Sequence, residues 1–127
     1  MTGVDATAEE LARRIGEPGL VLLDVRSAEE YSGESGYPCD ARQGHLPGAR
    51  HLDVGELFQC ATAEEVREEV GLPEGAEIVA YCHSGSRSAM AVSILLSAGY
   101  VARNYPGSWH EWSADLTLPV VTDSSVY

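Results

Sequence analysis

Short runs of apolar residues constrain the fold of this chain more than any other feature. Leu20–Val25 and Ile78–Tyr81 lack the alternation of a half-exposed strand, so we expect both to be strands covered on both faces. Val101–Tyr105 is a third strand candidate. Helical patterns lie between these strands, and this alternation predicts an α/β fold with a mostly parallel sheet.

The segments between the strands carry helix and loop signals. Thr7 precedes Glu10 by three residues, which predicts a capping box at the start of the first helix. Residues 32–48 are rich in Gly, Ser, Pro and Asp and are expected to form a long loop, and the tail after Pro119 is expected to be frayed. Helices are expected over residues 6–15, 27–31, 54–58, 62–70, 88–97 and 109–112.

Length and charge limit the classes of partner. At 127 residues the chain is expected to form a single domain over 1–127. Eight basic residues stand against 20 acidic ones, for a net charge of -12, so the chain repels nucleic acid and anionic membranes and neither is an expected partner. No apolar run approaches the ~20 residues of a membrane span, and no signal peptide is evident.

The three cysteines, Cys39, Cys60 and Cys82, are odd in number and match no zinc spacing, so we expect no metal. No cofactor is expected either. Without an export signal, a cytoplasmic location with free thiols is expected.

Cys82 opens the segment that carries chemistry. It stands between a strand and a helix, where ligands of parallel sheets bind. Unpaired N–H groups at a helix start, the helix dipole and Arg87 favour a thiolate, and Gly85 lets the loop curl so that amides converge on it. The alternative, a buried structural thiol, does not explain why these features occur together. We therefore predict that Cys82 is a nucleophile, with its binding groups supplied by His83, Ser84, Gly85, Ser86, Arg87 and Ser88.

Four motifs in order, spanning nearly the whole chain, resemble a rhodanese-family sulfurtransferase domain. They are Leu22–Arg26 with Glu29–Tyr31, Gly44–Ala49, Cys82–Arg87 and Gly107–Trp112. The resemblance implies a central parallel sheet with helices on both faces. It also implies that Cys82 takes a sulfane sulfur from a donor such as thiosulfate, as a persulfide, and passes it to cyanide or a thiol.

The resemblance is strongest to the catalytic half of two-domain thiosulfate sulfurtransferases. The long loop of this chain over residues 32–43, here called the insertion, is part of that resemblance. A single-domain version and an excised domain both remain open. The loop from Cys82 through Arg87 has six residues, the length that the resemblance associates with sulfur transfer, whereas phosphatase relatives have one more. His83 and Arg87 favour thiosulfate over 3-mercaptopyruvate. Glu30 departs from the animal enzymes, which have a substrate-binding arginine there.

Other residues are expected to support the site. Asp24 and Arg26 either shape its wall or, as we favour, form a buried ion pair with the Glu29–Glu30 turn. His45 is expected to hold loops together, and Trp109 to line the core and the pocket wall.

The remaining histidines and thiols are less constrained. His83 either tunes the thiolate or contacts the donor, while His51 and His110 are expected at the surface or in packing. Cys39 and Cys60 are expected to be dispensable thiols, although Cys39 is alternatively a group that reacts with a Cys82 persulfide.

Three function classes follow: a thiosulfate sulfurtransferase, a persulfide carrier that delivers sulfur to a protein thiol, and a non-catalytic regulatory module. Intact Cys82 and Arg87 argue against the third.

Overall fold

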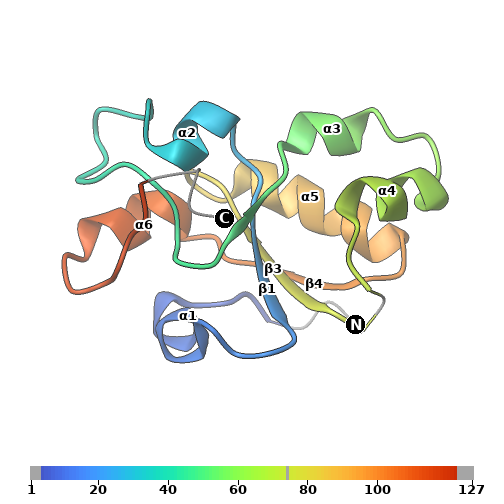
Figure 1. Cartoon of the computed structure of the whole chain (residues 1–127), viewed down its shortest axis with the longest axis horizontal. Coiled ribbons are helices and arrows are strands. Elements are labelled where there is room, and N and C mark those ends of the chain that lie inside the picture. The colour runs from blue at the N-terminus through green and yellow to red at the C-terminus, as the bar shows by residue number, and fades with distance from the viewer. Residues whose placement is uncertain (1–3, 74, 123–127) are drawn as a thin grey trace.

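The structure, a computed structural model, describes residues 4–73 and 75–122 (Figure 1). Its centre is a four-stranded sheet in the order β2-β1-β3-β4, and every neighbouring pair is parallel. This confirms the expected α/β class. The strands are β1 (Leu20–Asp24), β2 (Arg50–His51), β3 (Glu77–Tyr81) and β4 (Val101–Asn104).

The sheet register places the carboxyl ends of β1, β3 and β4 side by side. Asp24, the last residue of β1, pairs with Tyr81, the last residue of β3, and Asn104 at the end of β4 pairs with Ala80. Because all strands run in the same direction, the residues that follow them gather at one edge of the sheet. Cys82 directly follows β3 and therefore lies at that edge.

Helices cover both faces of the sheet, as Figure 1 shows with α1 on the side opposite α3, α4 and α5. Leu57, Val66 and Leu95 of the latter three helices pack with Ile78 of β3. On the other face, Leu11 and Trp109 pack with Val79 of β3. The helices are α1 (Ala8–Arg14), α2 (Ala28–Ser32), α3 (Val54–Phe58), α4 (Ala63–Val70), α5 (Ser86–Ser97) and α6 (Ser108–Ala114).

The helix caps differ from expectation at α1. The Thr7 hydroxyl accepts a hydrogen bond from the Glu10 amide, but the Glu10 carboxylate pairs with Arg14 and Arg103 instead of returning to the cap. Two cations close by hold the carboxylate more strongly than one backbone amide would, so the capping box predicted at α1 is wrong.

Several boundaries differ because tertiary contacts fix them. The strand β2 was not predicted, since two residues show no periodicity. Helix α5 begins at Ser86 rather than Ser88, so its first residues lie within the segment Cys82–Arg87 that was expected to be a loop. The tail is held as far as it is described, because Val121 pairs with His45 through backbone hydrogen bonds of 2.7 and 2.9 Å. Residues 123–127, for which fraying was also predicted, lie outside the described residues.

Within residues 4–73 and 75–122, no helix combines the length and the apolar character needed to cross a bilayer.

Candidate active site

The Cys82 sulfur lies in a nest of donors at the start of α5. The residue is only 1% exposed. Its Sγ accepts hydrogen bonds from the Gly85 amide at 3.1 Å and from the Ser88 amide and hydroxyl, both at 3.4 Å. Three donors converging on one sulfur at a helix N-terminus favour its negatively charged form.

This donor set controls the protonation of the thiol. Burial acts to raise the pKa of Cys82, but hydrogen bonds from the Ser88 hydroxyl, the Ser88 amide and the Gly85 amide outweigh it. The pKa of the thiol is therefore lowered from its ordinary value. Because the thiolate is the nucleophilic form of cysteine, these surroundings favour nucleophilic reactivity at Cys82.

The loop from Cys82 to Arg87, here called the cysteine loop, needs a glycine at position 85. Gly85 has φ of 98°, and a Cβ there would lie 2.8 Å from the Pro106 carbonyl oxygen. The Asn104 side chain also donates to the Gly85 carbonyl at 3.2 Å. The left-handed turn that points the Gly85 amide at the sulfur is thus fixed by the end of β4 and the residues that follow it.

Ser108 supports the nucleophile from α6 and was not predicted as a site residue. Its hydroxyl accepts a hydrogen bond from the Cys82 amide at 3.0 Å and donates to the Tyr105 carbonyl at 2.8 Å. Its φ of 53° is uncommon for a residue with a side chain. Ser108 lies in the Gly107–Trp112 motif, and membership in that motif is the sequence signal that could have identified it as a site residue.

The remaining polar groups of the cysteine loop face different surroundings. Ser84 and Ser86 are exposed, although the backbone amide of Ser84 also contributes to lowering the pKa of Cys82. His83 turns toward the insertion, where its Nε2 lies 3.0 Å from Asp40 Oδ1 and its ring stacks on Tyr37 at 3.7 Å.

Arg87 is held by Glu30 through hydrogen bonds of 3.0 and 3.3 Å. Burial acts to raise the pKa of Glu30, but the Arg87 guanidinium outweighs it and the pKa is lowered. The Arg87 guanidinium, which we expect to attract an anionic sulfur donor, is therefore already paired with the Glu30 carboxylate. Glu30 also borders a pocket of about 330 Å³ lined by Ser27, Glu30, Ser35, Gly36, Tyr37 and Pro38.

The family of this chain follows from its match to a family model. A family model described as a rhodanese-like domain matches residues 7–115. The chain belongs to the rhodanese-like family. This confirms the resemblance drawn from the four sequence motifs.

Individual relatives of this rhodanese-like chain are longer than it is. It is 35% identical over 116 residues to the putative thiosulfate sulfurtransferase SseB of Mycobacterium tuberculosis, covering 86% of this chain and 40% of that protein. It is 35% identical over 125 residues to a probable 3-mercaptopyruvate sulfurtransferase of Pseudomonas aeruginosa, covering 91% and 43%. A crystal structure of a probable thiosulfate sulfurtransferase is similar with a TM-score of 0.78 and 44% identity, covering 92% of this chain and 47% of that chain. The chain thus spans less than half the length of each of these relatives.

The rhodanese-like site rests on a buried ion pair at the end of β1. Asp24 and Arg26 are 0% and 1% exposed, and the guanidinium contacts the carboxylate at 2.7 and 3.0 Å. Arg26 also donates to the Gly44 carbonyl and lies over the Trp109 ring at 5.1 Å. The expected ion pair with the Glu29–Glu30 turn is therefore wrong, because Asp24 is close enough to satisfy Arg26 itself.

His45 and Trp109 join loops around the site. The His45 ring stacks on Tyr31 at 3.8 Å, and its Nδ1 lies 2.7 Å from the Tyr31 carbonyl oxygen. The Trp109 indole donates to the Arg42 carbonyl at 2.8 Å, while its backbone amide donates to the Cys82 carbonyl at 2.9 Å. His45 and Trp109 thus each link segments that lie far apart in the sequence, and their supporting role at the site stays a prediction.

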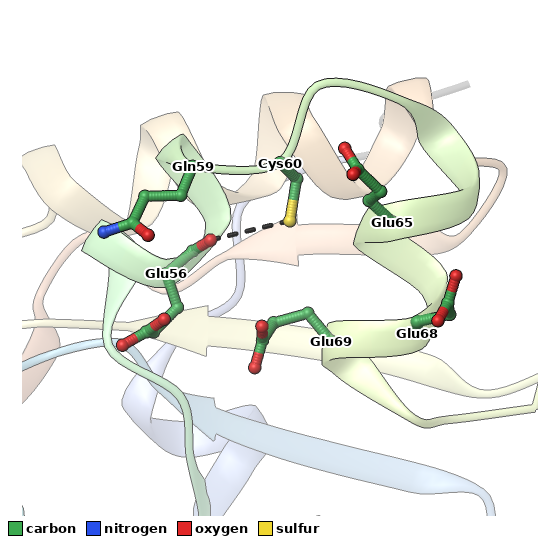
Figure 2. A pocket seen from close by; sticks show the side chains of 6 residues that line it. All are labelled: Glu56, Gln59, Cys60, Glu65, Glu68 and Glu69. Carbon is green, nitrogen blue, oxygen red and sulfur yellow. Dashed lines mark hydrogen bonds between the residues drawn. The ribbon is translucent and has the colours of Figure 1, made fainter.

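Cys60 lies in a different environment, an acidic pocket of about 450 Å³ between α3 and α4 (Figure 2). Its sulfur points toward the Glu56 carbonyl at 3.5 Å. Desolvation and the neighbouring carboxylates of Glu69, Glu65 and Glu56 raise the pKa of the Cys60 thiol. The acids disfavour a thiolate, so Cys60 is a poor nucleophile.

Replacing Cys60 with serine is therefore expected to leave the reactivity of Cys82 nearly unchanged, since the acidic surroundings disfavour a Cys60 thiolate. Steady-state assays of thiocyanate formation measure the effect. A loss of more than about tenfold in kcat/KM, or ~1.4 kcal/mol of barrier, would mean that Cys60 takes part in the cycle.

Proposed function

We propose that this rhodanese-like domain is a sulfurtransferase that moves a sulfane sulfur from thiosulfate to a thiophilic acceptor through a persulfide on Cys82. The single observation that carries the proposal is the nest of the Gly85 amide and the Ser88 amide and hydroxyl around the Cys82 sulfur. The relatives named as sulfurtransferases support the same reaction class.

The first half-reaction is a displacement at sulfur. The Cys82 thiolate attacks the outer sulfur of thiosulfate, a new Sγ–S bond forms, and the S–S bond of the donor breaks. The electron pair of that bond leaves with sulfite, so that Cys82 carries a persulfide anion. No external oxidant or reductant is needed.

The second half-reaction returns the enzyme to its starting state. Cyanide or another thiophile attacks the outer sulfur of the persulfide, and the Sγ–S bond breaks with its electron pair on Cys82. Cyanide leaves as thiocyanate. Because Cys82 must be a thiolate before each cycle, the proposal expects a reducing compartment such as the cytoplasm.

The protein assists by holding negative charge. Helix α5 begins at Ser86, so N–H groups of its first turn have no partner within the helix and are available to an anion. Donors already in place around Cys82 stabilise the charge that develops on the outer sulfur without reorganising during the reaction.

The donor is tested by comparing kcat/KM for thiosulfate, 3-mercaptopyruvate and an aryl phosphate. We expect thiosulfate to exceed 3-mercaptopyruvate by about tenfold, ~1.4 kcal/mol, and the aryl phosphate to be untouched. The Pseudomonas relative makes 3-mercaptopyruvate the strongest competitor. A preference for 3-mercaptopyruvate would overturn the donor assignment while leaving the Cys82 persulfide in place.

Replacing Glu30 with glutamine is expected to lower the KM for thiosulfate, because the Arg87 charge is then no longer compensated. Glutamine still accepts the hydrogen bond that Ser27 donates to Glu30. A partly exposed ion pair is worth up to about 1 kcal/mol, so we expect a decrease of about fivefold with little change in kcat.

The exposed neighbour supplies the control for this variant, since Glu29→Gln removes the same charge without touching Arg87. A KM that rises in Glu30→Gln but not in Glu29→Gln would show that Glu30 positions Arg87 rather than masking it.

A further inference from the structure

Four potential metal ligands from three separate segments meet beside the cysteine loop. Cys39 and Asp40 come from the insertion, His83 directly follows Cys82, and His110 lies on α6. One ligand atom from each of these residues lies within 4.8 Å of all the others. Nothing in the sulfur-transfer steps above uses this cluster.

The cluster is centred on the Asp40 carboxylate. Its Oδ1 lies 3.0 Å from His83 Nε2 and 2.9 Å from His110 Nδ1, so one oxygen faces two imidazole nitrogens. The Asp40 side chain is only 1% exposed. The same three atoms can share hydrogen bonds, with imidazole N–H groups donating to the carboxylate, or can face one cation placed between them.

Cys39 adds a soft ligand on the same side. Its Sγ lies 4.0 Å from His83 Nε2, 3.9 Å from His110 Nδ1 and 3.9 Å from Asp40 Oδ1. Ligand atoms at the usual zinc distances in a tetrahedron are about 3.3–3.6 Å apart. The five distances given among the four ligand atoms run from 2.9 to 4.0 Å, a range that brackets that separation.

The imidazole rings are held in place before any ion arrives. The His83 ring stacks on Tyr37 with an angle of 12° between the planes, and the His110 ring meets it edge-on. The His110 amide also donates to the His83 carbonyl at 3.0 Å, which ties α6 to the cysteine loop. Preorganised rings reduce the entropy that binding would otherwise cost.

We propose that Cys39, Asp40, His83 and His110 bind one Zn²⁺ ion per chain. Thiolate, imidazole and carboxylate are the ligand types that zinc takes in proteins, and four of them complete a tetrahedral site. The Cys39 thiol gives up its proton to solvent on binding, and both imidazoles bind in the neutral form. The net charge of -12 favours the approach of a cation.

The cysteine spacing alone predicts no zinc site, because only one cysteine takes part and the two histidines lie far along the chain. Bound zinc would tie the insertion and α6 to the residue next to the nucleophile. The proposal does not depend on which sulfur donor the protein uses.

The test uses the full chain in the Cys82→Ser background, because the Cys82 thiolate could itself bind zinc. The protein is stripped with a chelator, kept reduced with a phosphine, and titrated with Zn²⁺ by calorimetry and with Co²⁺ by absorbance. We expect one ion per chain, a thiolate-to-cobalt charge-transfer band, and the intense visible bands of tetrahedral cobalt.

The ligand variants Cys39→Ser and His110→Ala replace exposed side chains and should leave the fold intact. Outer-shell substitutions already cost about 10–100-fold in metal affinity, so each ligand variant should lose about 100-fold or more. Cys60→Ser is the matched control and should bind zinc as the parent does.

Three outcomes would overturn the proposal. They are no zinc binding in the micromolar range or tighter, zinc binding that Cys39→Ser and His110→Ala leave unchanged, and a cobalt spectrum without the thiolate band. The last would mean that Cys39 is not a ligand and that the proposed four-ligand site is wrong.

Discussion

Cys82→Ser is expected to abolish the persulfide and the turnover that depends on it. A serine hydroxyl is nearly the same size as the thiol, so the nest of donors around it should persist. The hydroxyl is a far weaker nucleophile toward sulfur and has no depressed pKa. Removing an enzyme's nucleophile costs on the order of 10⁴-fold or more in kcat, and we expect a loss on that scale.

The measurement has two parts. Incubation with thiosulfate should add the mass of one sulfur atom to the parent protein, located by peptide mapping on the segment containing Cys82, and add nothing to Cys82→Ser. Thiocyanate formation should fall to the uncatalysed rate in the same variant. The Cys60→Ser protein controls for nonspecific sulfur uptake and should carry the adduct.

Persistent turnover in Cys82→Ser would remove the basis of the proposed function. An adduct on Cys39 in that variant would have a narrower meaning. It would show that the Cys39 thiol of the insertion accepts sulfur directly.

Arg26→Met is expected to give the largest loss of stability among single substitutions at the site. The Asp24–Arg26 pair is buried, so removing the guanidinium leaves the Asp24 carboxylate without its cation and the Gly44 carbonyl without its donor. Breaking a buried pair by removing one partner costs about 3–5 kcal/mol, and we expect a decrease of that size in the free energy of unfolding.

Denaturant unfolding with a matched exposed control measures this loss. Arg13→Met makes the same substitution at an exposed position of α1 and should change the free energy of unfolding by no more than about 0.5 kcal/mol. The double variant Asp24→Leu with Arg26→Met should recover part of the loss, because it leaves no unpaired charge. If Arg26→Met were as stable as Arg13→Met, the pair would contribute nothing to folding.

The sequence predicted those parts of the protein that depend on neighbours in the chain. The strands β1 and β3 follow from apolar runs, since a run without alternation has to be covered on both faces. The placement of Cys82 between a strand and a helix is equally local, and so is the glycine that the turn of the cysteine loop requires. These features were predicted because each is set by residues a few positions apart.

Only the tertiary structure decided which groups face one another across the site. Glu30 compensates Arg87 from 57 positions away, and Ser108 holds the Cys82 amide from 26 positions away. The cluster of Cys39, Asp40, His83 and His110 draws on three segments that meet only once the sheet has formed. The physical reason is that packing sets the partners of a charge or a polar side chain, whereas sequence spacing records only the separation along the chain.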